Sequence, residues 1–246
     1  MTMALDIARC FDAALMARDC GIVPDDWQGK LLREEPRRAL LLCSRQSGKT
    51  TVAGLMGLHR ALYVSGSLVL IVSPSQRQSG EIFRTVIGFY HKLTGAPELA
   101  AESALRAEFK NGSRIVALPG NEKTIRGYSG ANLIILDEAS RIEDELVGGI
   151  TPMLATTNGS LIALTTPAGK IGWFYDQWIG ADDWTRVRVN ASECPRISKQ
   201  FLEEEMRRLG PSVFSQEYDL EFVDASDSMW SADSIIFEDY PTLFGR

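Results

Sequence analysis

The sequence has no long apolar run and no cysteine or histidine motif. No apolar segment approaches the ~20 residues that a membrane-spanning helix needs, because LVLIVSP and LIILDE are only as long as strands. The four cysteines show no CxxC spacing and form no cluster with the two histidines. The sequence therefore predicts no membrane contact, no disulfide framework and no zinc site, but reduced, buried thiols in a cytoplasmic protein.

An excess of positive charge is also lacking. The 246 residues carry a formal net charge of −6, which argues against a protein that coats nucleic acid over its whole surface. Short basic clusters do occur, for example Arg37 with Arg38 and Arg186 with Arg188. Each cluster is open to two interpretations, solvated surface charge or a local DNA contact.

Strand-like and helix-like segments alternate along the chain, without an internal repeat or a low-complexity linker. Short apolar runs predict strands at 39–43, 67–73, 133–136 and 160–165. Helical spacing predicts helices at 1–19, 48–64, 81–93, 143–154 and 198–209. The pair Asn111-Gly112 predicts a hairpin over 107–118. This pattern is typical of an α/β protein with a mostly parallel sheet that is covered by helices on both faces.

A phosphate-binding loop follows the first predicted strand. It reads CSRQSGKT from Cys43 to Thr50, with cysteine in place of the usual first glycine. Gly48 lets the backbone approach phosphates, Lys49 offers a cation to the β and γ oxygens, and the Thr50 hydroxyl can bind magnesium. The N-terminus of the next helix also favours an anion. The residues predicted to bind nucleotide here are Ser44, Arg45, Gln46, Ser47, Gly48, Lys49, Thr50 and Thr51.

An acidic pair ends the strand at 133–136. Asp137 and Glu138 follow four apolar residues, and the carboxyl ends of parallel strands are where ligands bind in such sheets. Asp137 is the candidate magnesium ligand. Glu138 points the other way by strand alternation, and it is the candidate base that orients and deprotonates the attacking water.

Two arginines are candidates for stabilising charge on the transferred phosphoryl group. Arg45 lies inside the phosphate loop, where it could contact the γ-phosphate of its own subunit or pair with a nearby carboxylate. Arg126 lies beside Gly127 and is a candidate arginine finger for a neighbouring subunit's site. A structural salt bridge is the competing interpretation for Arg126.

Three further residues carry weaker indications. Gln28 precedes the first strand, where its amide could pair with the adenine edge or simply lie on a helix surface. Thr165 and Thr166 end the strand after the acidic one, where their hydroxyls could sense a γ-phosphate or satisfy the turn before Pro167.

These elements, in this order, resemble the N-terminal ATPase domain of the large terminase subunit of tailed bacteriophages, the motor that packages DNA into a procapsid. The matching segments are DDWQ, CSRQSGKTT, IRGYSGANLIILDEAS, ALTTPAG and FSQEYDLEF. The resemblance covers Trp27 to Val223. It implies a RecA-like P-loop ATPase over residues 1–223, with a mostly parallel central sheet flanked by helices.

The resemblance also implies roles and partners. Gln28 would contact adenine, Thr165 and Thr166 would couple hydrolysis to movement, and Arg126 would act within a ring of subunits. ATP and Mg²⁺ would be the cofactors. Double-stranded DNA, a portal protein and a small terminase subunit would be the partners of the ring, which would be a pentamer when assembled. The expected location is the bacterial host's cytoplasm, with transient binding at the procapsid portal.

One departure from the family concerns the C-terminal end. Large terminases continue into a nuclease domain with a two-metal acidic site, whereas this chain stops at Arg246 after a polar, acidic stretch over 224–246. We interpret that stretch as a linker-like tail and expect no nuclease activity from this chain. The sequence leaves open whether the chain is a fragment, a split-gene subunit or a prophage remnant.

Two alternatives to a packaging ATPase remain from the sequence. A helicase-like ATPase would share the glutamine, the phosphate loop and the DE pair, but it needs a second motor domain. A degenerate nucleotide-binding remnant or assembly subunit would explain Cys43. Against it, Lys49, Thr50, Asp137 and Glu138 are all present.

Overall fold

A single eight-stranded sheet organises the protein in the computed structural model, which describes residues 3–120, 125 and 127–223. The strands are β1 (Arg38–Cys43), β2 (Leu68–Ser73), β3 (Leu99–Glu102), β4 (Arg106–Phe109), β5 (Arg114–Pro119), β6 (Leu133–Asp137), β7 (Ser160–Thr165) and β8 (Thr185–Val189). Their order across the sheet is β3-β4-β5-β2-β6-β7-β1-β8. The pairings of β3 with β4 and of β4 with β5 are antiparallel, and the other pairings are parallel. The predicted mostly parallel α/β class is confirmed.

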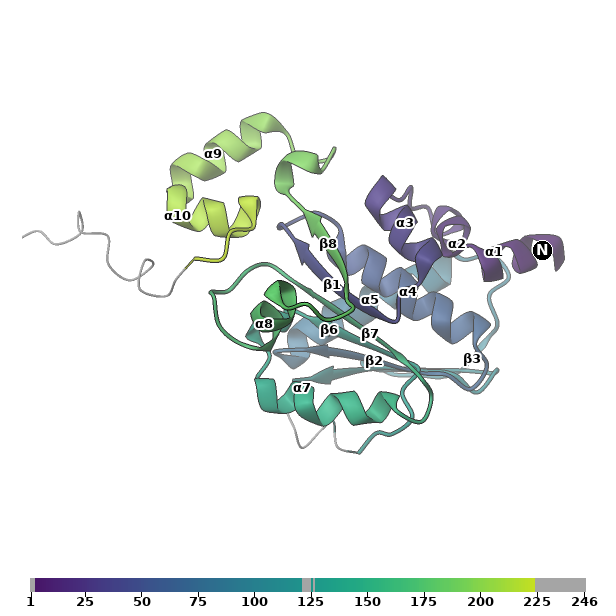
Figure 1. The fold of residues 1–246 in the computed structure, drawn as a ribbon. Coiled ribbons are helices and arrows are strands. Elements are labelled where there is room, and N and C mark those ends of the chain that lie inside the picture. Colours follow the sequence, from purple (N-terminus) through teal and green to yellow (C-terminus); the bar gives the residue numbers. More distant parts are fainter. Residues whose placement is uncertain (1–2, 121–124, 126, 224–246) are drawn as a thin grey trace, which may run out of the picture.

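Helices cover both faces of this sheet (Figure 1). The α-helices are α1 (Met3–Phe11), α2 (Ala13–Asp19), α3 (Asp26–Glu34), α4 (Lys49–Tyr63), α5 (Gln76–Lys92), α7 (Asp144–Ile150), α8 (Trp173–Ile179), α9 (Lys199–Leu209) and α10 (Pro211–Phe214). Short helical turns are η1 (Ala139–Arg141), η2 (Thr151–Leu154), η3 (Ala191–Glu193) and the π-helical η4 (Ser215–Asp219). Within the described ranges, no helix is long and apolar enough to cross a membrane.

Strand alternation divides the interior into two cores. In β1, Leu41 and Cys43 pack with α2, α3, α4 and α5 on one face of the sheet. Leu40 and Leu42 point to the other face and pack with α7 and α8. Because both faces are covered, the central parallel strands β1, β2, β6 and β7 are almost wholly apolar, which is why short apolar runs located them in the sequence.

The hairpin predicted around Asn111 is confirmed as β4 and β5. Gly112 has φ +83°, a left-handed conformation that glycine adopts at no steric cost. The backbone N–H of Ser113 donates to Oδ1 of Asn111 at 3.0 Å. A local turn therefore sets this antiparallel pairing, as the sequence indicated.

Two predicted helices differ from the expectation, since one is divided in two and the other begins earlier. The single helix expected over 1–19 is broken at Asp12, whose Oδ1 accepts a hydrogen bond from the N–H of Ala14 and caps α2. The helix expected from Glu81 begins at Gln76 instead, because Ser75 caps it by accepting from the N–H of Gln78. In both cases a short polar side chain decides the boundary.

The helix expected over 143–154 is also shorter than predicted. It ends at Ile150, and a 3₁₀ turn that contains Pro152 follows. Proline lacks the N–H that would continue the α-helical ladder.

The last described part of the chain forms a small helical unit at one end of the sheet. Helices α9 and α10 project beyond the strands (Figure 1). Phe214 and Tyr218 pack with Ala191 in a core of their own. The linker-like tail expected over 224–246 lies outside the described residues.

Candidate nucleotide-binding site

The phosphate loop connects β1 to the N-terminus of α4. Gly48 has φ +91°, and a Cβ on it would lie 2.5 Å from Nε2 of Gln28, so only glycine fits there. Cys43 is fully buried in the core beneath α4 and ends the strand. Burial raises the pKa of its thiol to about 12. Cysteine replaces glycine here as an inert core residue, one step before the loop turns.

Lys49 joins the loop to the acidic end of β6. Its Nζ lies 3.0 Å from Oε1 of Glu138, and Arg141 reaches Oε2 of the same carboxylate at 2.6 Å. Glu138 has φ +50°, so the backbone turns sharply after the strand and directs its side chain toward the loop. The structure therefore brings together the two motifs that the sequence predicted separately.

Asp137 ends β6 on the face of the sheet that Ile135 shares with α4. Its side chain is buried, and its Oδ1 has no hydrogen-bond partner among the described residues. Burial, together with the nearby Glu138 charge, raises the pKa of Asp137 to about 6. A buried carboxylate oxygen without a partner is costly, and a cation would satisfy it.

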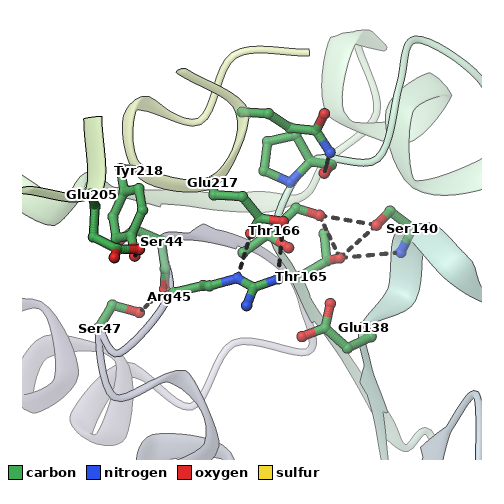
Figure 2. A network of polar contacts seen from close by, with 12 residues as sticks. Ser44, Arg45, Ser47, Glu138, Ser140, Thr165, Thr166, Glu205, Glu217 and Tyr218 are labelled. Atoms are coloured by element: carbon green, nitrogen blue, oxygen red, sulfur yellow. Dashed lines mark hydrogen bonds and ion pairs between the residues drawn. The ribbon is translucent and has the colours of Figure 1, made fainter. Parts of the chain in front are cut away.

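The threonines at the end of β7 form a network with the residues after the acidic pair (Figure 2). Oγ of Ser140 lies 2.6 Å from Oγ1 of Thr165 and donates to the carbonyl of Thr166 at 3.0 Å. Arg141 is 3.4 Å from Oγ1 of Thr166. Thr165 and Thr166 are therefore hydrogen-bonded to the segment that directly follows Glu138.

Arg45 pairs with a carboxylate, which is one of the two alternatives left open by the sequence. Its guanidinium donates to Glu217 of η4 at 2.8 and 3.1 Å (Figure 2). The neighbouring Gln216 donates to the carbonyl of Pro167 at 2.8 Å, just after the Thr165-Thr166 pair. One C-terminal segment thus contacts both the phosphate loop and the end of β7.

Gln28 lies beside the loop and not on an open helix surface. Its Oε1 accepts from the N–H of Asp25, and its Nε2 donates to the carbonyl of Gly48 at 3.1 Å. These two bonds fix the orientation of the amide. Arg196 clamps the same region, since it pairs with Asp25 at 2.7 Å and donates to the carbonyl of Ser47.

Two cavities lie along the loop. One, of about 530 Å³, is lined by Arg45, Gln46, Lys49, Gln78, Glu138, Arg141 and Thr166. The other, of about 270 Å³, is lined by Gly21, Ile22, Val23, Gln28, Gly48, Thr51 and Arg196. The first gathers the charged groups suited to phosphates, and the second adjoins the glutamine amide.

The donor set suits magnesium only together with a nucleotide. No group of three or more histidine, cysteine or acidic side chains that could hold a metal occurs in the described part of the chain. Mg²⁺ typically takes one or two protein ligands and completes its shell with waters and phosphate oxygens. Thr50 at the start of α4 and the unsatisfied Oδ1 of Asp137 fit that requirement.

Sequence reasoning missed several contacts of this site. Ser140 and Arg141 follow the DE pair directly, so their position next to it could have indicated a role. Glu217 and Arg196 lie more than 140 residues from the loop positions they contact, and no local pattern marks them. Arg126, the candidate finger, lies outside the described residues.

Comparisons with known proteins show the family to which the chain belongs. The profile of the family described as "Terminase large subunit, T4likevirus-type, N-terminal" matches residues 40–237. The chain is 26% identical to "Terminase, large subunit" of Thermus virus P23-45, in an alignment that covers 86% of this chain and 51% of that protein. The chain thus spans about half the length of the curated relatives it matches.

Solved structures share the fold. The large terminase ATPase domain of Thermus phage P74-26 superposes with a TM-score of 0.75 at 21% identity, covering 84% of this chain and 97% of that one. The large terminase of the thermophilic bacteriophage D6E in complex with ATP-gamma-S gives a TM-score of 0.62 at 14% identity, covering 92% and 57%. The chain therefore shares its RecA-like fold with large terminase ATPase domains, and it belongs to the family of terminase large subunits, whose N-terminal part it matches.

Proposed function

We propose that residues 1–223 form an ATPase domain that hydrolyses ATP with Mg²⁺. The observation that carries this proposal is the 3.0 Å contact between Lys49 of the phosphate loop and Glu138 at the end of β6, next to the unsatisfied carboxylate oxygen of Asp137. Phosphate binding, metal binding and water activation each need one of these three side chains. All three converge on the carboxyl end of the parallel sheet, where such sheets bind ligands.

Each residue has a distinct chemical task in this proposal. Lys49 and the N–H groups at the start of α4 hold the β- and γ-phosphates. Thr50 and Asp137 hold Mg²⁺, which offsets the charge on the phosphate oxygens when it is bound. Glu138 accepts a proton from the water that attacks the γ-phosphorus. Gln28, whose amide orientation is fixed by two hydrogen bonds, lies where the adenine would enter the smaller cavity.

A structural change caused by hydrolysis can be passed on through the hydrogen-bonded threonines. Thr165 and Thr166 are tied to the segment after Glu138 by Ser140 and Arg141. Through Pro167 the same strand end contacts Gln216 of the C-terminal helical unit. A change at the γ-phosphate would therefore reach both the segment after Glu138 and the C-terminal helical unit.

We further infer that the whole protein drives double-stranded DNA into a viral procapsid. Membership of the terminase large subunit family supports this function over that of a helicase. In this proposal the subunits form a ring, a pentamer when assembled, in which Arg126 completes a neighbour's site. A portal protein and a small terminase subunit are the partners, and the motor works in the bacterial host's cytoplasm, transiently bound at the procapsid portal.

The proposal is tested by ATP hydrolysis per subunit as the protein concentration rises, with and without linear duplex DNA. A rate per subunit that climbs with concentration supports a site completed by a neighbouring subunit. A rate that is flat but depends on Glu138 supports an ATPase that completes its own site, and Arg45 becomes the finger. Nucleotide binding without any turnover would instead support the degenerate remnant.

A further inference from the structure

A buried hydroxyl without a partner lies at the carboxyl end of β2. Ser73 is the last residue of that strand and is fully buried, yet its Oγ makes no hydrogen bond within residues 3–120, 125 and 127–223. Its backbone carbonyl, in contrast, accepts from the N–H of Gly120 at 2.7 Å. Native proteins leave few buried polar atoms unsatisfied, because each one costs folding free energy. The Ser73 hydroxyl therefore needs an explanation.

Strand register places Ser73 beside Asp137. The strands β2 and β6 are parallel neighbours in which Val72 is paired with Leu136. Ser73 and Asp137 are the next residues of each strand. Side chains alternate along a strand, so both project to the face on which Ile71 and Ile135 pack beneath α4 and α5.

Two unsatisfied buried oxygens thus lie at adjoining positions of one sheet edge. They are Oγ of Ser73 and Oδ1 of Asp137, neither of which has a partner in the part of the chain that the structure describes. Lys49 begins the helix above the same face. A single structural water could hydrogen-bond to both oxygens. The phosphate loop lies next to them, however, which indicates that their partners are bound together with the nucleotide.

We propose that Ser73 is a positioning residue for the magnesium, and that its hydroxyl holds a water of the metal's hydration shell next to Asp137. This inference rests on the proposed function. Mg²⁺ dehydrates reluctantly and keeps several waters, so its site needs hydrogen-bond partners for waters as well as direct ligands. A serine hydroxyl can accept a hydrogen bond from such a water. The metal would then satisfy Oδ1 of Asp137, and its water would satisfy Oγ of Ser73.

The test is nucleotide binding by Ser73→Ala as a function of Mg²⁺ concentration, measured with a fluorescent ATP analogue. The Mg²⁺ concentration at half-maximal binding should rise about 3- to 10-fold, the effect of one lost hydrogen bond. Binding of the analogue in EDTA should not change. The thermal midpoint of the nucleotide-free protein should stay the same or rise, because the substitution removes a polar atom that has no partner.

Ser79→Ala is the matched control. Ser79 is also a fully buried serine, but its Oγ donates to the carbonyl of Gln76 at 3.1 Å. Its removal should leave the Mg²⁺ requirement unchanged and should not raise the thermal midpoint.

Three results would overturn the inference. An unchanged Mg²⁺ requirement in Ser73→Ala, or an equal loss of nucleotide affinity with and without Mg²⁺, shows that the hydroxyl does not serve the metal. A lower thermal midpoint of nucleotide-free Ser73→Ala shows that the hydroxyl serves the apoprotein's own structure. In each case the wild type still binds the analogue. A wild type that binds none at any Mg²⁺ concentration contradicts the proposed function itself, and the inference fails with it.

Discussion

Nζ of Lys49 and Oε1 of Glu138 lie 3.0 Å apart, so the cation of the phosphate loop is paired with the carboxylate that we assign as the base. Both side chains are largely shielded, with 12% and 18% of their surfaces exposed. A γ-phosphate bound to Lys49 would compete for this ammonium. Nucleotide binding is therefore expected to free Oε1 of Glu138 for its contact with water, while Arg141 still holds Oε2.

Lys49→Ala should abolish nucleotide binding and ATP turnover together. The loop then loses its only lysine, and the two arginines that line the cavity, Arg45 and Arg141, are already paired with Glu217 and Glu138. Binding is measured by titration with a fluorescent ATP analogue, and turnover by phosphate release. Lys30→Ala is the control, because Lys30 is exposed on α3 and pairs only weakly with Glu34 at 3.8 Å. Turnover near the wild-type rate in Lys49→Ala would refute the site.

Asp137→Asn should stabilise the nucleotide-free protein in a pH-dependent way. Burial raises the pKa of Asp137 from its ordinary value of 3.8 to about 6. In the unfolded chain the carboxyl ionises above pH 4, so its burial increasingly opposes folding as the pH rises from 4 to 6. The gain of the asparagine variant should reach at most about 3 kcal/mol above pH 6 and vanish near pH 4.

The measurement is urea denaturation of Asp137→Asn and the wild type at a series of pH values. The exposed Asp183→Asn serves as the control and should show little change at any pH. A gain that grows as the pH falls would contradict the assignment of Asp137 as a buried, unsatisfied carboxylate.

The pair of Arg45 and Glu217 should be energetically coupled. Glu217 is mostly buried, whereas 61% of the Arg45 side chain is exposed, so solvent weakens the pair. A double-mutant cycle of Arg45→Ala and Glu217→Ala should give a coupling energy of about 0.5–1.5 kcal/mol in urea denaturation. The exposed pair of Lys30 and Glu34 should give less. Additive effects of the two substitutions would show that the contact does not hold the C-terminal unit to the loop.

Arg126 should act on a neighbouring subunit. If it does, mixing Arg126→Ala subunits with Glu138→Gln subunits creates interfaces that join an intact finger to an intact base. Phosphate release by the mixture should then exceed that of either variant alone. The absence of rescue at every mixing ratio would favour a structural salt bridge for Arg126.

Local sequence patterns were sufficient to predict the central strands of the sheet, the phosphate loop and the DE pair of the site. The buried parallel strands are short apolar runs, so β1, β2, β6 and β7 could be located from the sequence. The phosphate loop and the DE pair are contiguous motifs. Their meeting followed from a general rule, because the carboxyl ends of parallel strands lie at one edge of a sheet.

The remaining contacts depend on register and on distant parts of the chain. Ser73 becomes a candidate only because strand register places it beside Asp137, and no sequence motif assigns a function to a serine before a proline. Glu217 reaches Arg45 across 172 positions. The break at Asp12 was missed because the helical spacing continues through it, while a cap decides the boundary.

The most direct test of the account is Glu138→Gln, which keeps the volume of the side chain and removes the base. We predict that affinity for the fluorescent ATP analogue stays within a few-fold of wild type, while phosphate release in a single turnover falls ~10²-fold or more. That result would assign Glu138 to the chemical step. Equal losses of affinity and turnover would assign it to metal binding instead, and turnover near the wild-type rate would contradict the proposed mechanism.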